Sequence, residues 1–126
     1  MGAFNIGAQV MGGGFSAGQV SALQGSRATA VTAAGTVIGT ATALGAAINL
    51  VTTATADQGV ALPNLGLGDS VLIYNSATGA TIKVYPDSSS NTINQLTAGS
   101  AMSLANNTAV TLTKVTSSRW VAILSA

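Results

Sequence analysis

The chain has 126 residues, of which only four are basic and three acidic, and it contains no Glu, His or Cys. Soluble domains usually carry about a quarter of charged residues, so we expect much of this surface to be covered by protein in the working state. The net charge of +1 argues against a nucleic-acid partner, and the missing residue types argue against an enzyme and a thiolate metal site.

Residues 1–27 form a distinct first segment, which is rich in Gly and carries no charge before Arg27. Gly raises the entropy cost of fixing the backbone. We therefore expect a segment that is extended or disordered alone and that orders against a partner as an arm, with an ordinary tail as the alternative. The candidate anchors of this arm are Phe4, Ile6, Val10, Met11 and Phe15.

Residues 28–55 alternate small polar and small apolar residues, and their many Thr favour strand over helix. This pattern predicts two strands, over 35–43 and 46–55, with a turn near Gly45. A membrane-spanning helix over 28–51 is an alternative, because this stretch has no charge. Its Ala, Thr and Gly contribute little to insertion, so we expect no membrane partner.

Alternation is clearest in the middle of the chain. It predicts strands over 70–74 and 81–85, the second with Ile82 and Val84 inward and Tyr85 outward. The turn residues between these strands predict that they pair as a hairpin.

The C-terminal part predicts further strands, with Met102 and Leu104 on one face and with Val110 and Leu112 inward. The last strand, 119–124, is apolar on both faces, which suits a central strand or a strand whose second face meets another subunit. Its candidate core or subunit-interface residues are Trp120, Val121, Ile123 and Leu124.

These short strands and turns predict an all-β fold, an antiparallel sandwich or a jelly-roll-like barrel. The domain would span residues 28–126 and follow the extended Gly-rich arm of residues 1–27.

The three acidic residues, Asp57, Asp69 and Asp87, all fall in predicted loops. Asp readily hydrogen-bonds nearby backbone amides, so each is predicted to stabilise a turn. A calcium site built from two of them is the alternative, but the spacing of a calcium-binding loop is absent. We predict no catalytic, cofactor or metal site.

Short motifs follow one another between residues 57 and 123. They are Asp57-Gln-Gly-Val-Ala-Leu-Pro63, Gly68-Asp-Ser-Val-Leu-Ile-Tyr-Asn75, Ile82-Lys-Val-Tyr-Pro86, Thr92-Ile-Asn94, the stretch from Leu104 to Leu112, and Ser118-Arg-Trp-Val-Ala-Ile123. Together they resemble a β-module of structural proteins of tailed bacteriophages. The short chain is most similar to a stand-alone head decoration (cement) protein.

The resemblance implies a virion structural protein on the outer surface of the head. It would be a β-rich homotrimer that binds the major capsid protein and stabilises the shell without a cofactor. The arm would then contact the capsid. The alternative is a tail or fibre component that binds a host-receptor glycan through the polar loop around residues 87–91.

Overall fold

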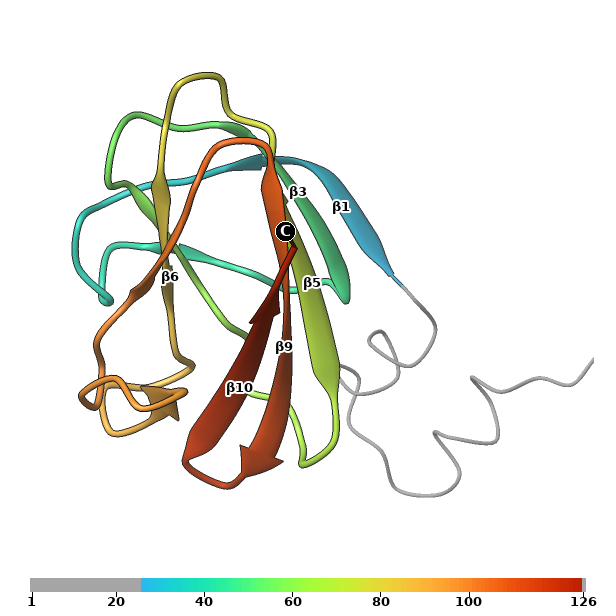
Figure 1. Cartoon of the computed structure of the whole chain (residues 1–126), viewed down its shortest axis with the longest axis vertical. Helices are drawn as coiled ribbons and strands as arrows, with labels where there is room; N and C mark the ends of the chain where they lie inside the picture. Colours follow the sequence, from blue (N-terminus) through green and yellow to red (C-terminus); the bar gives the residue numbers. More distant parts are fainter. Residues whose placement is uncertain (1–25, 126) are drawn as a thin grey trace, which may run out of the picture.

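The computed structural model describes residues 26–125, which form two facing β-sheets and no helix (Figure 1). The all-β prediction is therefore confirmed. The six-stranded sheet has the order β1-β3-β5-β9-β10-β7, and the four-stranded sheet has the order β2-β4-β6-β8. The strands are β1 (Arg27–Thr32), β2 (Thr42–Ala43), β3 (Ile48–Thr53), β4 (Gly59–Ala61), β5 (Ser70–Asn75), β6 (Ile82–Tyr85), β7 (Thr92–Ile93), β8 (Met102–Leu104), β9 (Thr108–Thr116) and β10 (Arg119–Leu124).

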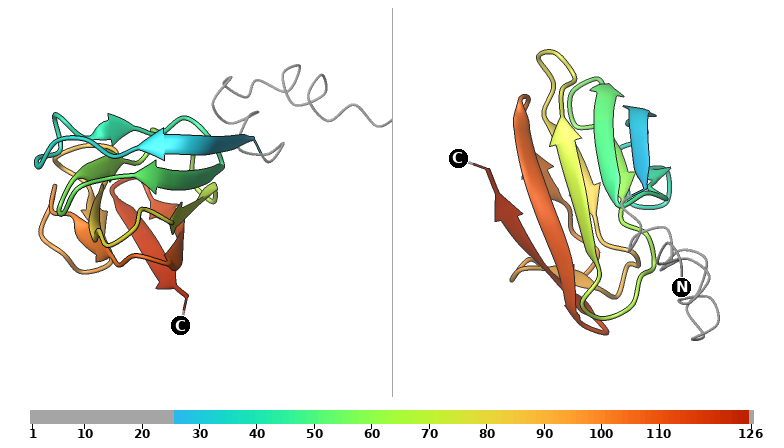
Figure 2. Two further views of the ribbon diagram at one scale, coloured as in Figure 1. Left: turned by 90° about the horizontal axis from the view of Figure 1, so that it is seen from above. Right: turned by 90° about the vertical axis from the view of Figure 1, so that its right-hand side faces the viewer.

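The chain alternates between the two sheets from β1 to β9, so it winds around the core in a solenoid-like manner (Figure 2). As a result β1, β3 and β5 are parallel neighbours in the larger sheet. In the smaller sheet β2, β4 and β6 are parallel in the same way. Parallel neighbours require crossover connections, and each crossover here contains a strand of the opposite sheet.

The predicted antiparallel sandwich or jelly-roll-like barrel is wrong in its topology. Antiparallel strand pairing is confined to β5 with β9, β9 with β10, and β6 with β8. The predicted hairpin of 70–74 with 81–85 does not form, because β5 and β6 belong to different sheets. The buried side chain of Asn75 holds the corner between them, since it donates to the carbonyls of Ala80 and Leu104.

Two local predictions are also corrected. The predicted strand 35–43 is mostly a turn, in which the amides of Thr40 and Ala41 donate to the Val37 carbonyl. Gly35 precedes this turn with a φ of 66°, a backbone conformation that glycine adopts easily. Tyr85 is buried rather than outward, and its hydroxyl donates to the Thr36 carbonyl.

The core lies between the sheets and collects the inward side chains of both. The predicted inward positions of Ile82, Val84, Val110 and Leu112 are confirmed. Met102 and Leu104 share a buried face, as expected. The largest fully buried side chain is Trp120 on β10.

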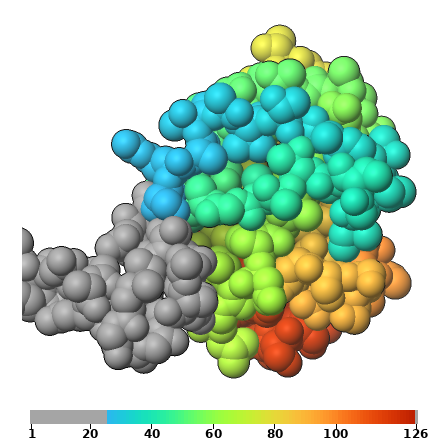
Figure 3. Space-filling model, turned by 180° about the vertical axis from the view of Figure 1, so that it is seen from behind, coloured from blue at the N-terminus to red at the C-terminus, as the bar shows by residue number. Residues whose placement is uncertain are grey.

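The N-terminal strands are an integral part of this core. β3 lies between β1 and β5 in one sheet, so residues 57–124 are not a separate structural unit. Viewed from the side opposite to Figure 1, residues of the first third of the described chain, in blue to turquoise, cover most of the upper surface (Figure 3). No helix among the described residues is long and apolar enough to cross a membrane.

Candidate functional site

The larger sheet has one face in the core and a second face turned away from the smaller sheet, which we call the outer face. Successive strand residues point to opposite faces, so the neighbours of the buried core positions form it. Its residues are Ile48 and Leu50 on β3, Ser70, Leu72 and Tyr74 on β5, Ala109, Thr111 and Thr113 on β9, and Val121 and Ile123 on β10.

The strand register brings these side chains into rows across four strands. Ile48 is paired with Leu72, Leu72 with Thr111, and Thr111 with Ile123. A second row joins Ser70, Thr113 and Val121. Across these four strands both rows consist of aliphatic side chains and hydroxyl groups, and on the edge strand β1 Arg27 ends the first row.

The charges of the chain lie at the ends of these rows or away from them. Asp57 and Lys83 form an exposed ion pair at 3.8 Å, which belongs to the smaller sheet. Arg27 lies in register with Ile48 on the edge strand β1, and Arg119 begins β10 and donates to the Thr92 hydroxyl. The two arginines therefore flank the outer face. The remaining charges are Asp69, in a turn, and Asp87 and Lys114, which face inward.

A shallow groove of about 300 Å³ opens on the outer face beside Ile123. Its lining is Leu72, Ala109, Thr111, Ile123, Leu124 and Ser125. Ile123 itself is 70% exposed, which is the largest exposed fraction of any large apolar residue among the described residues. A projecting side chain and a hollow are thus adjacent on one surface.

The structure separates the four residues predicted as core or subunit interface. Trp120 is fully buried in the core. Val121 and Ile123 lie exposed on the outer face, and Leu124 is exposed beside them at the end of β10. The predicted arm residues Phe4, Ile6, Val10, Met11 and Phe15 lie outside the described residues.

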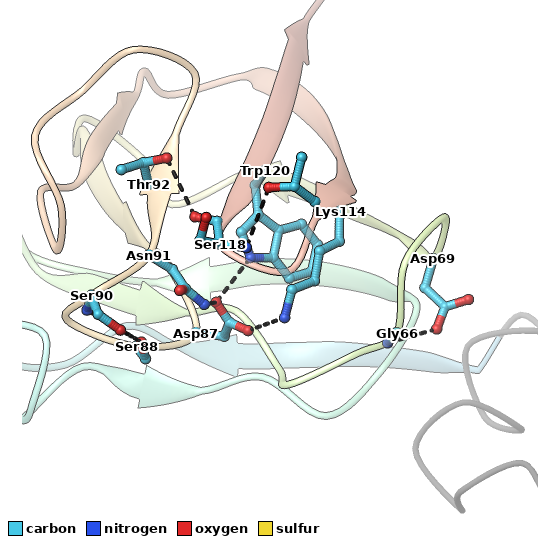
Figure 4. A network of polar contacts seen from close by, with 11 residues as sticks. Gly66, Asp69, Asp87, Ser88, Ser90, Asn91, Thr92, Lys114, Ser118 and Trp120 are labelled. Atoms are coloured by element: carbon cyan, nitrogen blue, oxygen red, sulfur yellow. Dashed lines mark hydrogen bonds and ion pairs between the residues drawn. The ribbon is translucent and has the colours of Figure 1, made fainter.

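A buried polar network lies at one end of the core, where a loop meets the β9–β10 hairpin (Figure 4). The Lys114 ammonium on β9 donates to Oδ2 of Asp87, which follows β6, at 2.7 Å. Oδ1 of Asp87 accepts from Trp120 Nε1 at 3.0 Å and from Asn91 Nδ2 at 2.7 Å. The side chains of Lys114 and Asp87 are only 7% and 3% exposed. The network therefore joins the loop after the smaller sheet to two strands of the larger one.

The pKa of Asp87 results from opposing effects. Burial disfavours the charged carboxylate and alone would raise the pKa. Hydrogen bonds from Asn91, Lys114 and Trp120, together with the positive charge of Lys114, outweigh burial and hold the pKa of Asp87 below its ordinary value. The carboxylate is thus ionised at neutral pH and forms an ion pair with Lys114.

The three aspartates differ in role, although one role was predicted for all. Asp69 stabilises its turn as predicted, because its carboxylate accepts from the Gly66 amide at 3.1 Å. Asp57 has a φ of 66° and pairs with Lys83 instead, and Asp87 belongs to the buried network. Residues 26–125 contain no cluster of three or more Asp, Glu, His or Cys side chains that could hold a metal ion.

Sequence reasoning missed the network, although one signal was present. In the alternation of β9, Lys114 occupies the inward position that follows Val110 and Leu112. A lysine at such a position needs a buried acidic partner, and the chain offers only three candidates.

Comparison with known proteins gave no relative: no protein-family model, no curated protein and no solved structure matches the chain. The resemblance to phage structural proteins accordingly stays a prediction from the motifs.

Proposed function

We propose that the protein is a structural subunit of a tailed-bacteriophage virion, a decoration protein on the outer surface of the head. As a homotrimer it would bind the major capsid protein and stabilise the shell. The observation that carries this proposal is the outer face, whose rows are aliphatic and hydroxyl side chains across four strands, with charges only at its edges, Arg27 and Arg119. Contiguous apolar surface of this kind marks a contact with another protein.

The charge distribution supports an assembly role over a catalytic one. Lys114 and Asp87 neutralise each other in the core, and Asp69 is bonded within its own turn. Few charges are therefore left to keep free copies apart in solution. A subunit whose surface is covered in an assembly does not need that repulsion.

In this proposal the arm of residues 1–27 contacts the capsid through its apolar residues. Ordering a Gly-rich segment costs conformational entropy. Three arms on one trimer offset this cost, because binding of the first arm raises the effective concentration of the other two.

The glycan-binding alternative is weaker. It requires free polar side chains in the loop around residues 87–91, yet the Asp87 carboxylate is buried and accepts from three donors. Asn91 uses its amide on the same carboxylate.

Quantitative mass spectrometry of the particles that contain this protein tests the proposal. A decoration protein is expected in a copy number comparable to that of the major capsid protein. A few copies per particle would instead mean a tail or fibre component, and absence from purified particles would refute a virion role.

A further inference from the structure

We infer that the outer face packs against a second copy of this chain, with Ile123 at the centre of the contact. This inference rests on the proposed function and goes beyond it, because it names the partner and the residues of the subunit interface. The shell protein and the segment 1–25 are the other conceivable occupants of this face.

The shape of the face suits a contact between copies. Ile123 projects from β10 with 70% of its surface exposed, and the groove lined by Leu72 and Thr111 lies beside it. A volume of about 300 Å³ is large enough for an aliphatic side chain. The outer faces of three copies can converge on a threefold axis, where each copy places Ile123 in the groove of the next copy.

Three of the four hydroxyls of the face, those of Ser70, Tyr74 and Thr113, are already bonded within one copy, so covering them costs little. The hydroxyls of Ser70 and Thr113 bond each other at 2.7 Å. The Tyr74 hydroxyl donates to Oδ1 of Asn107. Burial of a polar group is expensive mainly when its hydrogen bond is lost, and the charges of the face, Arg27 and Arg119, lie at its edges, where they can stay in water.

The size of the face fits a second copy better than a single chain segment. With β1 at its edge, the face spans the five strands of six or more residues. At about 4.8 Å apart and about 20 Å long, these strands give a footprint on the order of 500 Å². The three faces of a trimer together cover about 1,500 Å², which lies in the range of specific interfaces. One extended segment is about 5 Å wide and would leave most of the face open.

The open edge of β10 continues this surface. β7 pairs with β10 only at Arg119 and Trp120, and the Ala122 amide donates to Oδ1 of Asn94 at 2.9 Å. Only the end of β10 beyond Ala122 therefore has no neighbour on that side among the described residues. Leu124, 54% exposed, lies at this end. An open edge beside an apolar face is a common place for a neighbouring chain to bind.

Sedimentation equilibrium of the purified full chain, without any shell protein, tests the inference. We expect a concentration-dependent trimer. Ile123→Asp should weaken the association by about 30-fold or more, as expected of a central interface residue. Val37→Asp is the matched control, because Val37 is also exposed, at 56%, but lies in the loop between β1 and β2. It should associate like the wild type, and circular dichroism should show both variants folded.

Three results would overturn the inference. They are a wild-type chain that stays monomeric at all concentrations, an Ile123→Asp chain that associates like the wild type, and a loss of association only when residues 1–25 are removed. None of these results would alter the copy number in particles, so the proposed function would be judged separately.

Discussion

At the scale of single residues, Asp87 holds the buried polar network together, because its carboxylate accepts from three side chains. Its carboxylate neutralises Lys114 at 2.7 Å in a site where both side chains are almost fully buried. It also holds the indole of Trp120, the largest buried side chain. Removing one partner of a buried ion pair leaves the other charge without compensation, whereas exposed pairs contribute little.

Asp87→Asn should therefore lower the free energy of unfolding by about 3 kcal/mol. Asp57→Asn, which breaks the exposed pair with Lys83, should lower it by less than about 1 kcal/mol. Urea unfolding measures both values. Adding Lys114→Met to Asp87→Asn should restore part of the loss, because the unpaired ammonium is gone. Equal effects of the two single substitutions would contradict the structure.

The lowered pKa of Asp87 predicts that the free energy of unfolding depends on pH. The folded-state pKa of Asp87 lies below its unfolded-state value, which is about 3.9. The stability that Asp87 contributes is therefore fully present above about pH 5 and is lost as the pH falls through the lowered folded-state pKa. Urea midpoints between neutral and acid pH should converge for the wild type and Asp87→Asn. A constant difference down to the lowest pH would show that Asp87 does not titrate as described.

At the scale of strands, the sequence predicts which side chains face inward but not which strands pair. The inward positions of Ile82, Val84, Val110 and Leu112 follow from alternation alone, because burial of one face requires a period of two. Pairing depends on whether a turn reverses the chain within one sheet or carries it to the other. That choice rests on contacts such as the bond from Asn75 to Leu104, which is distant in sequence.

The residues of the outer face could likewise be predicted from the sequence only in part, because strand pairing was not predicted. Ile123 and Val121 were candidates for an interface because strand 119–124 is apolar on both faces. Ile48 and Leu72 could not be grouped with them, because β3 and β5 become neighbours only through the crossover that contains β4.

The close packing of β4 against β6 gives a prediction at this scale. A Cβ at Gly59 would lie 2.6 Å from Cε2 of Tyr85, whose ring is held by the bond of its hydroxyl to Thr36. Gly59→Ala should therefore destabilise the fold by about 1–3 kcal/mol. Gly45→Ala is the control, since nothing lies within 4 Å of its Cβ position. Thermal unfolding compares the two, and a Gly59→Ala protein as stable as the control would refute this packing.

At the scale of the whole molecule, the surface carries even fewer charges than the composition suggests. Part of the small charge complement is placed in the core as the pair of Asp87 and Lys114. The larger sheet then keeps an outer face whose charges, Arg27 and Arg119, lie only at its edges. Composition alone predicts that the protein is covered by partners, but only the folded sheet locates the surface proposed for that contact.

Removal of residues 1–25 distinguishes the proposed contact of the arm with the capsid from the proposed contact between copies through the outer face. The described strands begin at Arg27, and the core residues found among residues 26–125 all lie after it. The truncated chain should therefore keep its thermal midpoint and its self-association but no longer co-sediment with undecorated heads. Retained binding to heads would contradict the role of Phe4, Ile6, Val10, Met11 and Phe15 as capsid anchors.

The central claim is that the outer face is covered by protein in the assembled state, and cysteine labelling tests it most directly. The chain has no Cys, so a single Thr111→Cys, in the row of Leu72 and Ile123, reports on the outer face alone, and Thr97→Cys in an exposed turn serves as the reference. In the assembled protein, maleimide should modify position 111 at least about tenfold more slowly than in the dissociated Ile123→Asp background, while position 97 reacts equally in both. Equal rates at position 111 in the assembled and dissociated protein would contradict the claim.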